Sequence, residues 1–319
     1  NTTEAGVELW VVDLNTKKSK KLSEKYINDI LISPFQWFNS GSSLLVSYRC
    51  NSDMPLIKSV PSGPIIQQTN NQNAPSRTYQ DLIKNKNDEI LFEYYSCVEL
   101  HKVSINGSDS KIVDRGMIKD YDISPGQDYL LVKKIKKPFS YLVPYYRFPY
   151  EVKTINIDNN IENIIADIPI DEVRPIGFDA TRVGIRSVSW RDDKASELYW
   201  VEANDNGDPK VEVDGRDIVY TLESPFNGNK NELLRTNLRF SNIRWSTGNY
   251  AFLTERLWKN RNEVISLVDL KARSIDKVLF DRQYDDIYSN PGTPVYKKNN
   301  FNRNIVDIKK NSVYMVGQG

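Results

Sequence analysis

The residues best suited to binding chemistry in this 319-residue sequence are an arginine and the aromatic side chains around it. The segment 136–149 holds three prolines and five aromatic residues beside Arg147. Proline does not fit an ordinary strand interior, so we expect a loop at the end of a sheet. A guanidinium binds carboxylates through paired hydrogen bonds and stacks on rings. The segment therefore predicts either an anion-binding pocket, built by Arg147 with Tyr145 and Tyr146, or a rigid aromatic plug.

The sequence offers little for acid–base or nucleophilic catalysis. It contains one histidine, His101, and no Gly-x-Ser-x-Gly, His-Glu-x-x-His, Walker or Gly-x-Gly-x-x-Gly motif. His101 lies in an alternating segment without a positioned partner, so we expect it to face solvent or a sheet edge. The adjacent carboxylates Asp171-Glu172 and Asp285-Asp286 would point to opposite faces of a strand. We interpret them as solvated loop charges.

The two cysteines, Cys50 and Cys97, lie far apart in the sequence and form no Cys-x-x-Cys or Cys/His ligand pattern. With spacing as the only guide, we expect two separate thiols rather than a bridge. The sequence predicts no metal site and no cofactor.

The balance of charge excludes some classes of partner. There are 43 basic and 42 acidic residues, whereas a nucleic-acid-binding domain has a clear basic excess. No apolar run is long enough for a transmembrane helix, so we expect no membrane partner. Aromatic residues make up 11% of the chain, with 18 tyrosines, which is typical of an all-β protein.

The elements that would position these residues come from a repeat. A turn followed by a buried strand recurs five times, near Ser33-Pro34, Ser124-Pro125, Ser189-Trp190, Arg244-Trp245 and Ile308. A second pattern, a hairpin with a polar turn, accompanies it, for example around Asn106-Gly107. Spaced self-similarity of this kind indicates stacking of one supersecondary unit.

Pairing the two patterns predicts an all-β fold, a β-propeller with four full blades and two half blades. The full blades are expected at about 28–114, 119–169, 182–236 and 240–282. Residues 1–23 supply only an outer half blade, and residues 304–319 only an inner half. The halves could join and close a five-bladed ring, which would remove exposed edges. Alternatively, 1–319 is one propeller domain, incomplete at both ends, within a larger propeller.

One blade carries an insertion at about 55–96. Its first part is rich in Pro, Asn and Gln and is expected to be irregular. Apolar residues at helical spacing follow, from Leu82 to Tyr94, which predicts one or two short helices with Asn87 or Asp88 as a cap.

Six longer motifs carry a resemblance to a known family. They are Arg77–Leu82, Leu91–Tyr95, Pro138–Pro149, Arg186–Arg191, Leu198–Ala203 and Thr254–Lys259. In this order, over essentially the whole chain, they resemble the propeller of the glutamyl endopeptidase branch of the prolyl oligopeptidase family of serine peptidases.

The resemblance implies an N-terminal β-propeller that screens peptide substrates and a following α/β-hydrolase domain with a Ser-Asp-His triad. The chain matches only the propeller, so the catalytic domain is absent from these residues and the chain alone is expected to be inactive. The implied partners are a peptide substrate and the C-terminal hydrolase domain of the same parent protein. The composition, rich in Asn and Lys, suggests a bacterial source, and the resemblance suggests a periplasmic or exported protein.

A peptidase that cuts after glutamate needs a cation in its cleft. Four arginines lie in the family-like motifs and are the candidates for substrate binding: Arg147, Arg186, Arg191 and Arg256. Tyr145 and Tyr146 are candidate hydrogen-bond donors. Arg147 is preferred because it lies in a loop. The competing interpretation of the whole chain is a free-standing propeller that binds or scaffolds without peptidase activity.

Overall fold

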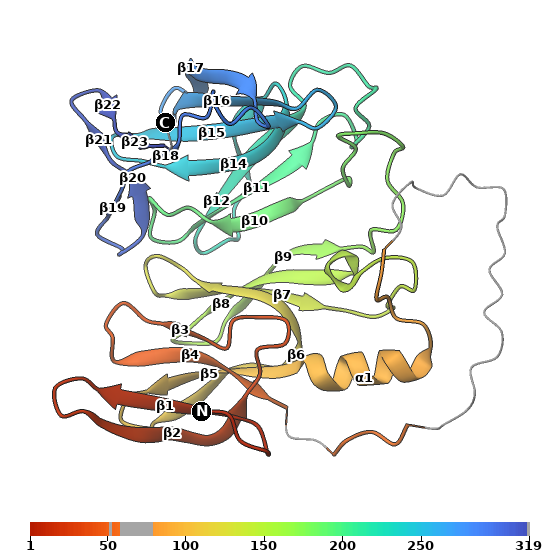
Figure 1. The fold of residues 1–319 in the computed structure, drawn as a ribbon, viewed down its shortest axis with the longest axis vertical. Coiled ribbons are helices and arrows are strands. Elements are labelled where there is room, and N and C mark those ends of the chain that lie inside the picture. Colours follow the sequence, from red (N-terminus) through yellow and green to blue (C-terminus); the bar gives the residue numbers. More distant parts are fainter. Residues whose placement is uncertain (51–52, 58–78, 318–319) are drawn as a thin grey trace. The chain divides into compact units, whose positions relative to one another are not determined.

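The computed structural model describes residues 1–50, 53–57 and 79–317 (Figure 1). The chain divides into two compact units. Unit 1 holds Asn1–Ile123 and Tyr129–Glu172, and unit 2 holds Ser124–Asp128 and Val173–Gly319. Both are built almost entirely from antiparallel strands, as the all-β prediction requires. Among the described residues, no helix has the length and apolar character needed to cross a membrane.

The strands of unit 1 form one continuous, hydrogen-bonded series. In sheet order these are β1 (Val7–Asp13), β2 (Lys18–Ile27), β4 (Ser43–Arg49), β5 (Cys97–Ser104), β6 (Asp109–Ile123), β7 (Tyr129–Ile135), β8 (Tyr150–Asn156) and β9 (Glu162–Ile168). A further short strand, β3 (Phe35–Trp37), lies off this series and pairs with β4. The first half of β6 pairs with β5 and its second half pairs with β7. The series therefore contains two four-stranded groups, β3–β6 and β6–β9.

These two groups correspond to the repeats predicted at 28–114 and 119–169, but the boundary between them differs. One long strand, β6, serves both groups without a break. Pairing passes from β5 at Met117 to β7 at Ile118, and the register then shifts between Ile118 and Asp120. A bulge bends and twists a strand, so β6 can change sheets without a loop.

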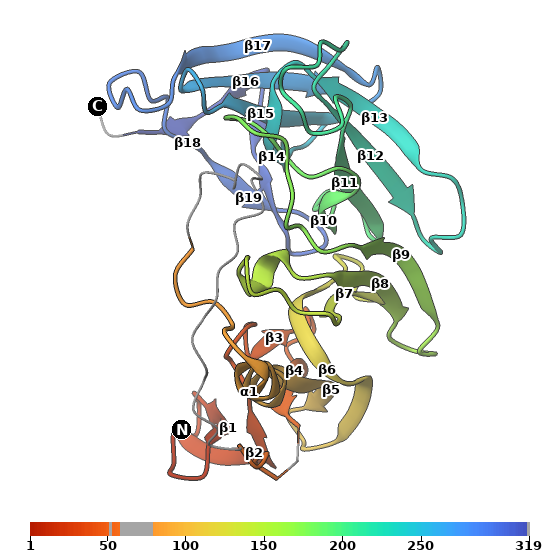
Figure 2. The same ribbon diagram turned by 90° about the vertical axis from the view of Figure 1, so that its right-hand side faces the viewer.

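Unit 2 contains two separate four-stranded sheets in simple sequential order. The strands are β10 (Arg186–Trp190), β11 (Glu197–Ala203), β12 (Asp217–Glu223) and β13 (Asn231–Thr236), then β14 (Arg239–Trp245), β15 (Tyr250–Leu257), β16 (Asn262–Asp269) and β17 (Ser274–Gln283). They coincide with the repeats predicted at 182–236 and 240–282. The two sheets lie face to face (Figure 2), and their apolar side chains form one core cluster.

The two predicted half blades have different outcomes. Residues 1–23 do form a hairpin, β1 with most of β2. The prediction of an inner half blade at 304–319 is wrong, because short two-stranded ribbons form there instead. They are built from β18 (Thr293–Pro294), β19 (Tyr296–Lys298), β20 (Asn304–Val306), β21 (Ile308–Lys309), β22 (Ser312–Val313) and β23 (Met315–Val316). Lys310 and Asn311 have φ angles of 47° and 60°, and this tight turn breaks the expected strand. No sheet among the described residues closes on itself.

In the described part of the insertion there is one helix, α1 (Lys86–Ser96), beside β6 (Figures 1 and 2). Its N-cap is Asn85, whose side chain accepts a hydrogen bond of 3.0 Å from the Asp88 backbone N–H. The prediction of Asn87 or Asp88 as cap was therefore off by two or three residues. Residues 79–83 are not helical. The irregular stretch predicted at 61–75 lies outside the described residues.

The expectation of two separate thiols is wrong, because Cys50 and Cys97 form a disulfide. Cys50 directly follows β4 and Cys97 opens β5, the neighbouring antiparallel strand. Strand pairing brings their Cα atoms to 5.5 Å, within the range a disulfide spans. The insertion separates the cysteines in sequence and hides this proximity.

Candidate functional site

Arg147 lies in a short 3₁₀ turn, Tyr145–Arg147, and is buried. Its Nε and Nη2 donate to the two carboxylate oxygens of Asp171 at 3.2 and 3.1 Å, and its Nη1 donates to the Tyr79 hydroxyl at 2.6 Å. Burial alone would lower the pKa of Arg147, but Asp171 and Tyr79 outweigh it and the pKa is raised. Asp171 is therefore a buried partner, and the prediction of a solvated loop charge is wrong for this residue.

The aromatic residues around Arg147 pack on α1. The Phe92 ring lies 5.3 Å from Phe139 and 5.7 Å from Phe148, both edge to face. Tyr145 and Tyr146 are 37% and 54% exposed, so they remain available at the surface. The geometry favours the aromatic plug over a pocket at Arg147, because its guanidinium is already occupied by a carboxylate.

Arg191 is also tied into the structure. It is buried, donates to Asp193 at 2.7 Å, and its guanidinium carbon stands 4.3 Å from the Trp245 ring centroid. Glu197 supplies a second carboxylate. Stacking and two carboxylates satisfy this cation locally.

Arg186 and Arg256, in contrast, line one cavity of about 330 Å³ in unit 2. They come from β10 and β15, which lie in different sheets. The other lining residues that matter for chemistry are Arg239, Phe240, Trp258 and Tyr284. The structure therefore brings together two of the four predicted arginines, and adds aromatic walls and a third arginine.

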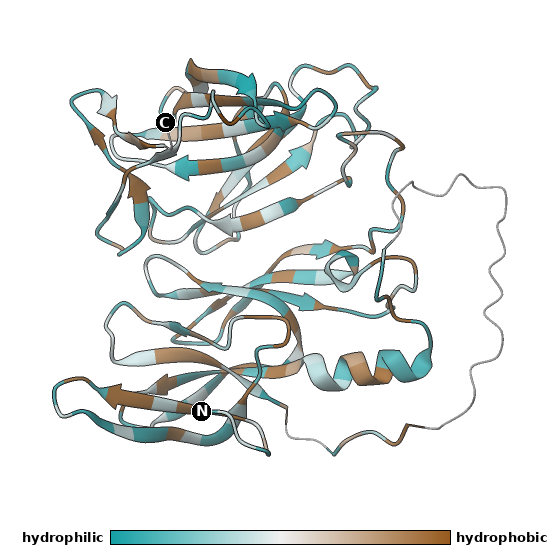
Figure 3. Cartoon of the chain, in the orientation of Figure 1, coloured by the Kyte–Doolittle hydropathy of each residue, from teal (hydrophilic) through white to brown (hydrophobic). Residues whose placement is uncertain are grey.

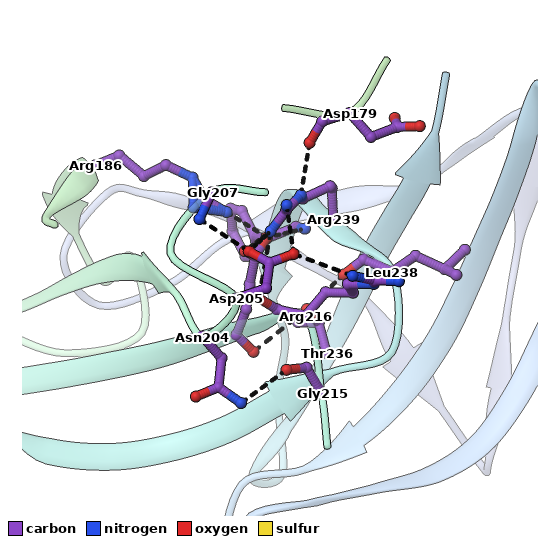
Figure 4. Close-up of polar contacts among 12 residues, drawn as sticks. Asp179, Arg186, Asn204, Asp205, Gly207, Gly215, Arg216, Thr236, Leu238 and Arg239 are labelled. Carbon is purple, nitrogen blue, oxygen red and sulfur yellow. Dashed lines mark hydrogen bonds and ion pairs between the residues drawn. The ribbon is translucent and has the colours of Figure 1, made fainter. Parts of the chain in front are cut away.

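Arg239, which lines the cavity, belongs to a buried cluster of charges. Figure 4 shows Arg186, Asp205, Arg216 and Arg239 of this cluster. Asp205 and Asp217 are both 0% exposed. Arg239 reaches both, with 2.6 Å from Nη2 to Asp205 Oδ2 and 3.0 Å from Nη1 to Asp217 Oδ1. Its Nε donates to the backbone carbonyl of Asp179 at 2.8 Å. Such contacts fix the Arg239 guanidinium in one orientation.

Two further arginines share the same carboxylates. Arg216 donates to Asp205 Oδ2 at 3.1 Å, and Arg186 pairs with Asp217 Oδ2. Three guanidinium groups thus share two carboxylates within this cluster. Asp179 adds a further carboxylate to the cavity wall, where it accepts hydrogen bonds from the Trp258 and Lys259 backbone N–H groups.

Arg186 is the member of the cluster with unused capacity. Within the described part of the chain, its buried Nη1 has no hydrogen-bond partner. Burial lowers the pKa of Arg186, and the charge of Asp217 opposes that shift. A buried donor without a partner costs free energy, so an acceptor entering the cavity would relieve that cost.

Arg256 is the accessible cation of the cavity, with half of its side chain exposed. Its Nε and Nη2 donate to Glu263 Oε2 at 2.7 and 2.5 Å, and its guanidinium stands over the Tyr284 ring at 5.3 Å. Glu263 is shared with Arg282, whose Nη2 lies 2.9 Å from the other oxygen. One carboxylate, Glu263, therefore holds both guanidinium groups.

His101 does not face solvent, so that prediction is wrong. It is 4% exposed, its Nδ1 lies 2.5 Å from Asp109, and its ring packs edge to face on Tyr48 at 5.1 Å. Val103 lies on the same face of β5, and the β1–β2 hairpin covers this face. In the described ranges, no group of three His, Cys, Asp or Glu residues is placed to hold a metal ion.

Sequence reasoning missed Arg239, Asp205 and Asp217. The signal that could have indicated them is the position of Asp217 and Arg239 as charged residues within strand patterns. A charged residue is seldom buried unless it is paired, so each of them implies a partner of opposite charge. The pairing itself joins two sheets and leaves no trace in sequence spacing.

Comparison with known proteins gives the chain its relatives. No family model matches it. It is 35% identical over 306 residues to a probable chloroplastic glutamyl endopeptidase of Oryza sativa subsp. japonica, covering 93% of this chain and 32% of that protein. The corresponding protein of Arabidopsis thaliana is 33% identical over 298 residues, covering 91% and 31%. The chain thus spans about a third of the length of these relatives.

Among solved structures, one from a study of two prolyl endopeptidases superposes with a TM-score of 0.46 at 12% identity, over 86% of this chain and 32% of that one. Both sequence relatives come from plants, so they give no support to the expectation of a bacterial source. Over more than nine-tenths of its length, this chain is thus similar to glutamyl endopeptidases.

Proposed function

We propose that these residues are the non-catalytic, N-terminal β-propeller region of a glutamyl-endopeptidase-like serine peptidase. In this role they restrict access to a catalytic domain elsewhere in the parent protein and help to bind its peptide substrate. The observation that carries the proposal is the 35% identity over 306 residues to a glutamyl endopeptidase three times as long.

The chemistry of the chain is consistent with a non-catalytic part. Its one histidine is enclosed between β5 and the β1–β2 hairpin, against Asp109 and Tyr48. A general base must reach the proton it removes from a substrate or nucleophile, and this buried position offers no such reach. The triad is therefore assigned to the hydrolase domain of the parent protein.

The propeller assignment rests on the repeat. Four groups of four antiparallel strands follow each other in sequence, and neighbouring groups within a unit share a core. We propose that each group is one blade and that the parent propeller contains more blades than these four.

For substrate binding we propose the cavity of Arg186 and Arg256 as the place where an acidic side chain of the peptide is held. Arg256 offers an accessible guanidinium, and Arg186 a buried donor that has no partner among the described residues. Carboxylates bind guanidinium groups with two parallel hydrogen bonds. Arg147 and Arg191 are poorer candidates, because both are buried and neither lines this cavity, whereas Arg256 keeps half of its side chain exposed although it pairs with Glu263.

The test replaces Arg256 by Ala in the whole natural peptidase and compares peptides with Glu or Gln at the cleaved position. We expect kcat/KM for the Glu peptide to fall about 10- to 100-fold, the value of one charge-assisted hydrogen bond, with little change for the Gln peptide. Arg256→Lys keeps the positive charge but loses the paired N–H donors of the guanidinium. Its kcat/KM for the Glu peptide should lie between the values of the unmodified enzyme and of Arg256→Ala.

The matched control is Arg235→Ala, because Arg235 is exposed. In the described part of the chain, Glu232 is the carboxylate with which it forms an ion pair, at 2.8 Å. This variant should leave both peptides unaffected. Equal losses for the Glu and Gln peptides with Arg256→Ala, or no loss for either, would show that the cavity does not read the acidic side chain.

A further inference from the structure

One wall of the cavity that Arg186 and Arg256 line is a tryptophan that remains exposed. Trp258 directly follows β15, in the hairpin turn that leads to β16, and it lines the same cavity. It is 49% exposed, although a ring of this size has much apolar surface to bury. The exposed indole is therefore placed to contact whatever ligand Arg256 binds.

The Trp258 ring is held in position from one side and from its own backbone. The guanidinium carbon of Arg261 lies over the ring, 3.8 Å from its centroid. The Trp258 backbone N–H donates to Asp179 Oδ1 at 2.5 Å, and its carbonyl accepts from the Arg261 backbone N–H at 3.4 Å. No ligand group fits into a gap of 3.8 Å, so the exposed part of the ring is not the face that Arg261 covers.

Arg261 is in turn fixed between two aromatic rings. Its Nη1 donates to the Tyr284 hydroxyl at 3.0 Å, and its backbone carbonyl accepts from the Tyr284 N–H at 2.8 Å. The Tyr284 ring lies 5.3 Å from the guanidinium carbon of Arg256. Rings and guanidinium groups therefore alternate in the order Trp258, Arg261, Tyr284, Arg256. Each of these contacts is attractive, so the wall is pre-organised and a ligand need not order it.

Arg256 and Trp258 are spaced as two side chains of an extended peptide are. β15 changes from apolar residues in its buried middle to the hydrophilic pair Glu255-Arg256 near its end, a change that Figure 3 shows. Side chains two positions apart in an extended chain point to the same side, about 6.6 Å apart. Arg256 and Trp258 are two positions apart, and both reach the cavity.

From this geometry we infer that Trp258 is a second specificity-determining contact of the cavity. It binds an aromatic or large apolar side chain that lies two positions from the acidic residue of the peptide. The inference rests on the proposed function, in which Arg256 holds that acidic residue. Covering the exposed indole with a ring or an aliphatic chain removes apolar surface from water, and Phe240 adds apolar surface to the same cavity.

The experiment uses the whole natural peptidase and peptides with Glu at the cleaved position. Phe or Ala is placed two residues before or two residues after that Glu. We expect kcat/KM to be about 10-fold higher with Phe than with Ala at one of these positions, the effect of covering part of an aromatic ring.

Variants of Trp258 separate this contact from the binding of the acidic side chain. Trp258→Ala should reduce the preference for Phe over Ala to about 1, and should leave the preference for Glu over Gln unchanged because Arg256 is intact. Trp258→Phe keeps a ring and should keep most of the preference for Phe. Trp10→Ala is the matched control and should keep both preferences, since Trp10 is 42% exposed but lies in β1 and does not line the cavity.

Three results would overturn the inference. The first is equal kcat/KM for Phe and Ala peptides at both positions in the unmodified enzyme. The second is a preference for Phe that persists in Trp258→Ala. The third is loss of both preferences in Trp258→Ala, because the ring would then support Arg256 rather than contact the peptide. Failure of the proposed function looks different: the preference for Glu over Gln would survive in Arg256→Ala.

Discussion

At the scale of the residue, the notable feature is a charged cluster buried among strands. Asp205 and Asp217 are fully buried, and Arg239 connects them at hydrogen-bond distances. A buried ion pair adds little net stability, whereas removing one partner costs several kcal/mol. Such a cluster therefore holds its members in place, and it fixes Arg186 at the rim of the cavity.

Glu255 gives this region a pH dependence. It is 1% exposed and accepts a hydrogen bond of 2.9 Å from the Leu238 backbone N–H. Burial raises the pKa of Glu255 above 4.5. The folded state therefore binds this proton more tightly than the unfolded chain does. Its contribution to the free energy of unfolding is full below pH 4.5 and is lost as pH rises through the raised pKa.

Glu255→Gln should remove that loss, because Gln keeps an acceptor for Leu238 and does not titrate. Urea unfolding between pH 4 and pH 8 would show a smaller fall in unfolding free energy with rising pH than in the unmodified protein. The exposed Glu223→Gln is the control and should follow the unmodified protein. Parallel curves for Glu255→Gln and the unmodified protein would contradict the burial argument.

Residue identities predicted four candidate arginines, but not which of them line a cavity. Arg186 and Arg256 line one, each while paired with a carboxylate, whereas Arg147 and Arg191 do not line it. The preference for Arg147 as a loop residue did not anticipate Asp171. Long-range partners such as this one are set by the packing of elements, which local sequence patterns do not encode.

At the scale of the element, strands were predictable and their connections less so. The repeats marked the four-stranded groups, and apolar spacing located α1. Two connections were not foreseen: β6 runs through two groups as one strand, and a turn at Lys310 and Asn311 divides the last predicted strand. Non-glycine residues rarely adopt positive φ, so the sequence pattern gave no warning of that turn.

The disulfide joins the two strands between which the insertion lies. It joins the end of β4 to the start of β5 across a sequence separation of 47 residues. A cross-link of that span restricts the unfolded chain and is worth about 4 kcal/mol by the chain-entropy relation. Replacing both cysteines by serine should lower the free energy of unfolding by roughly this amount, measured by urea unfolding without reductant.

Reductant supplies the internal check on the same quantity. A dithiol should lower the stability of the unmodified protein to that of the double serine variant, and should leave the variant unchanged. A loss below about 1 kcal/mol would mean that the reduced chain is held together by other contacts, contrary to the entropic account.

At the scale of the whole molecule, the repeat and the motifs predicted more than any single residue did. Four sequence repeats became four-stranded antiparallel groups, and the ordered motifs led to the family that the two plant relatives support. The number of blades around a common axis does not follow from the repeat alone, because local sequence patterns do not encode how one group of strands packs on the next.

We propose above that these residues are one region of a larger serine peptidase. The most direct test is the intact mass of the protein as its native host makes it, before and after labelling with a fluorophosphonate, which bonds to an activated serine. We predict a mass well above 36.8 kDa, with one label added per molecule. A protein of 36.8 kDa that takes up no label would contradict the claim, and would instead identify a free-standing propeller.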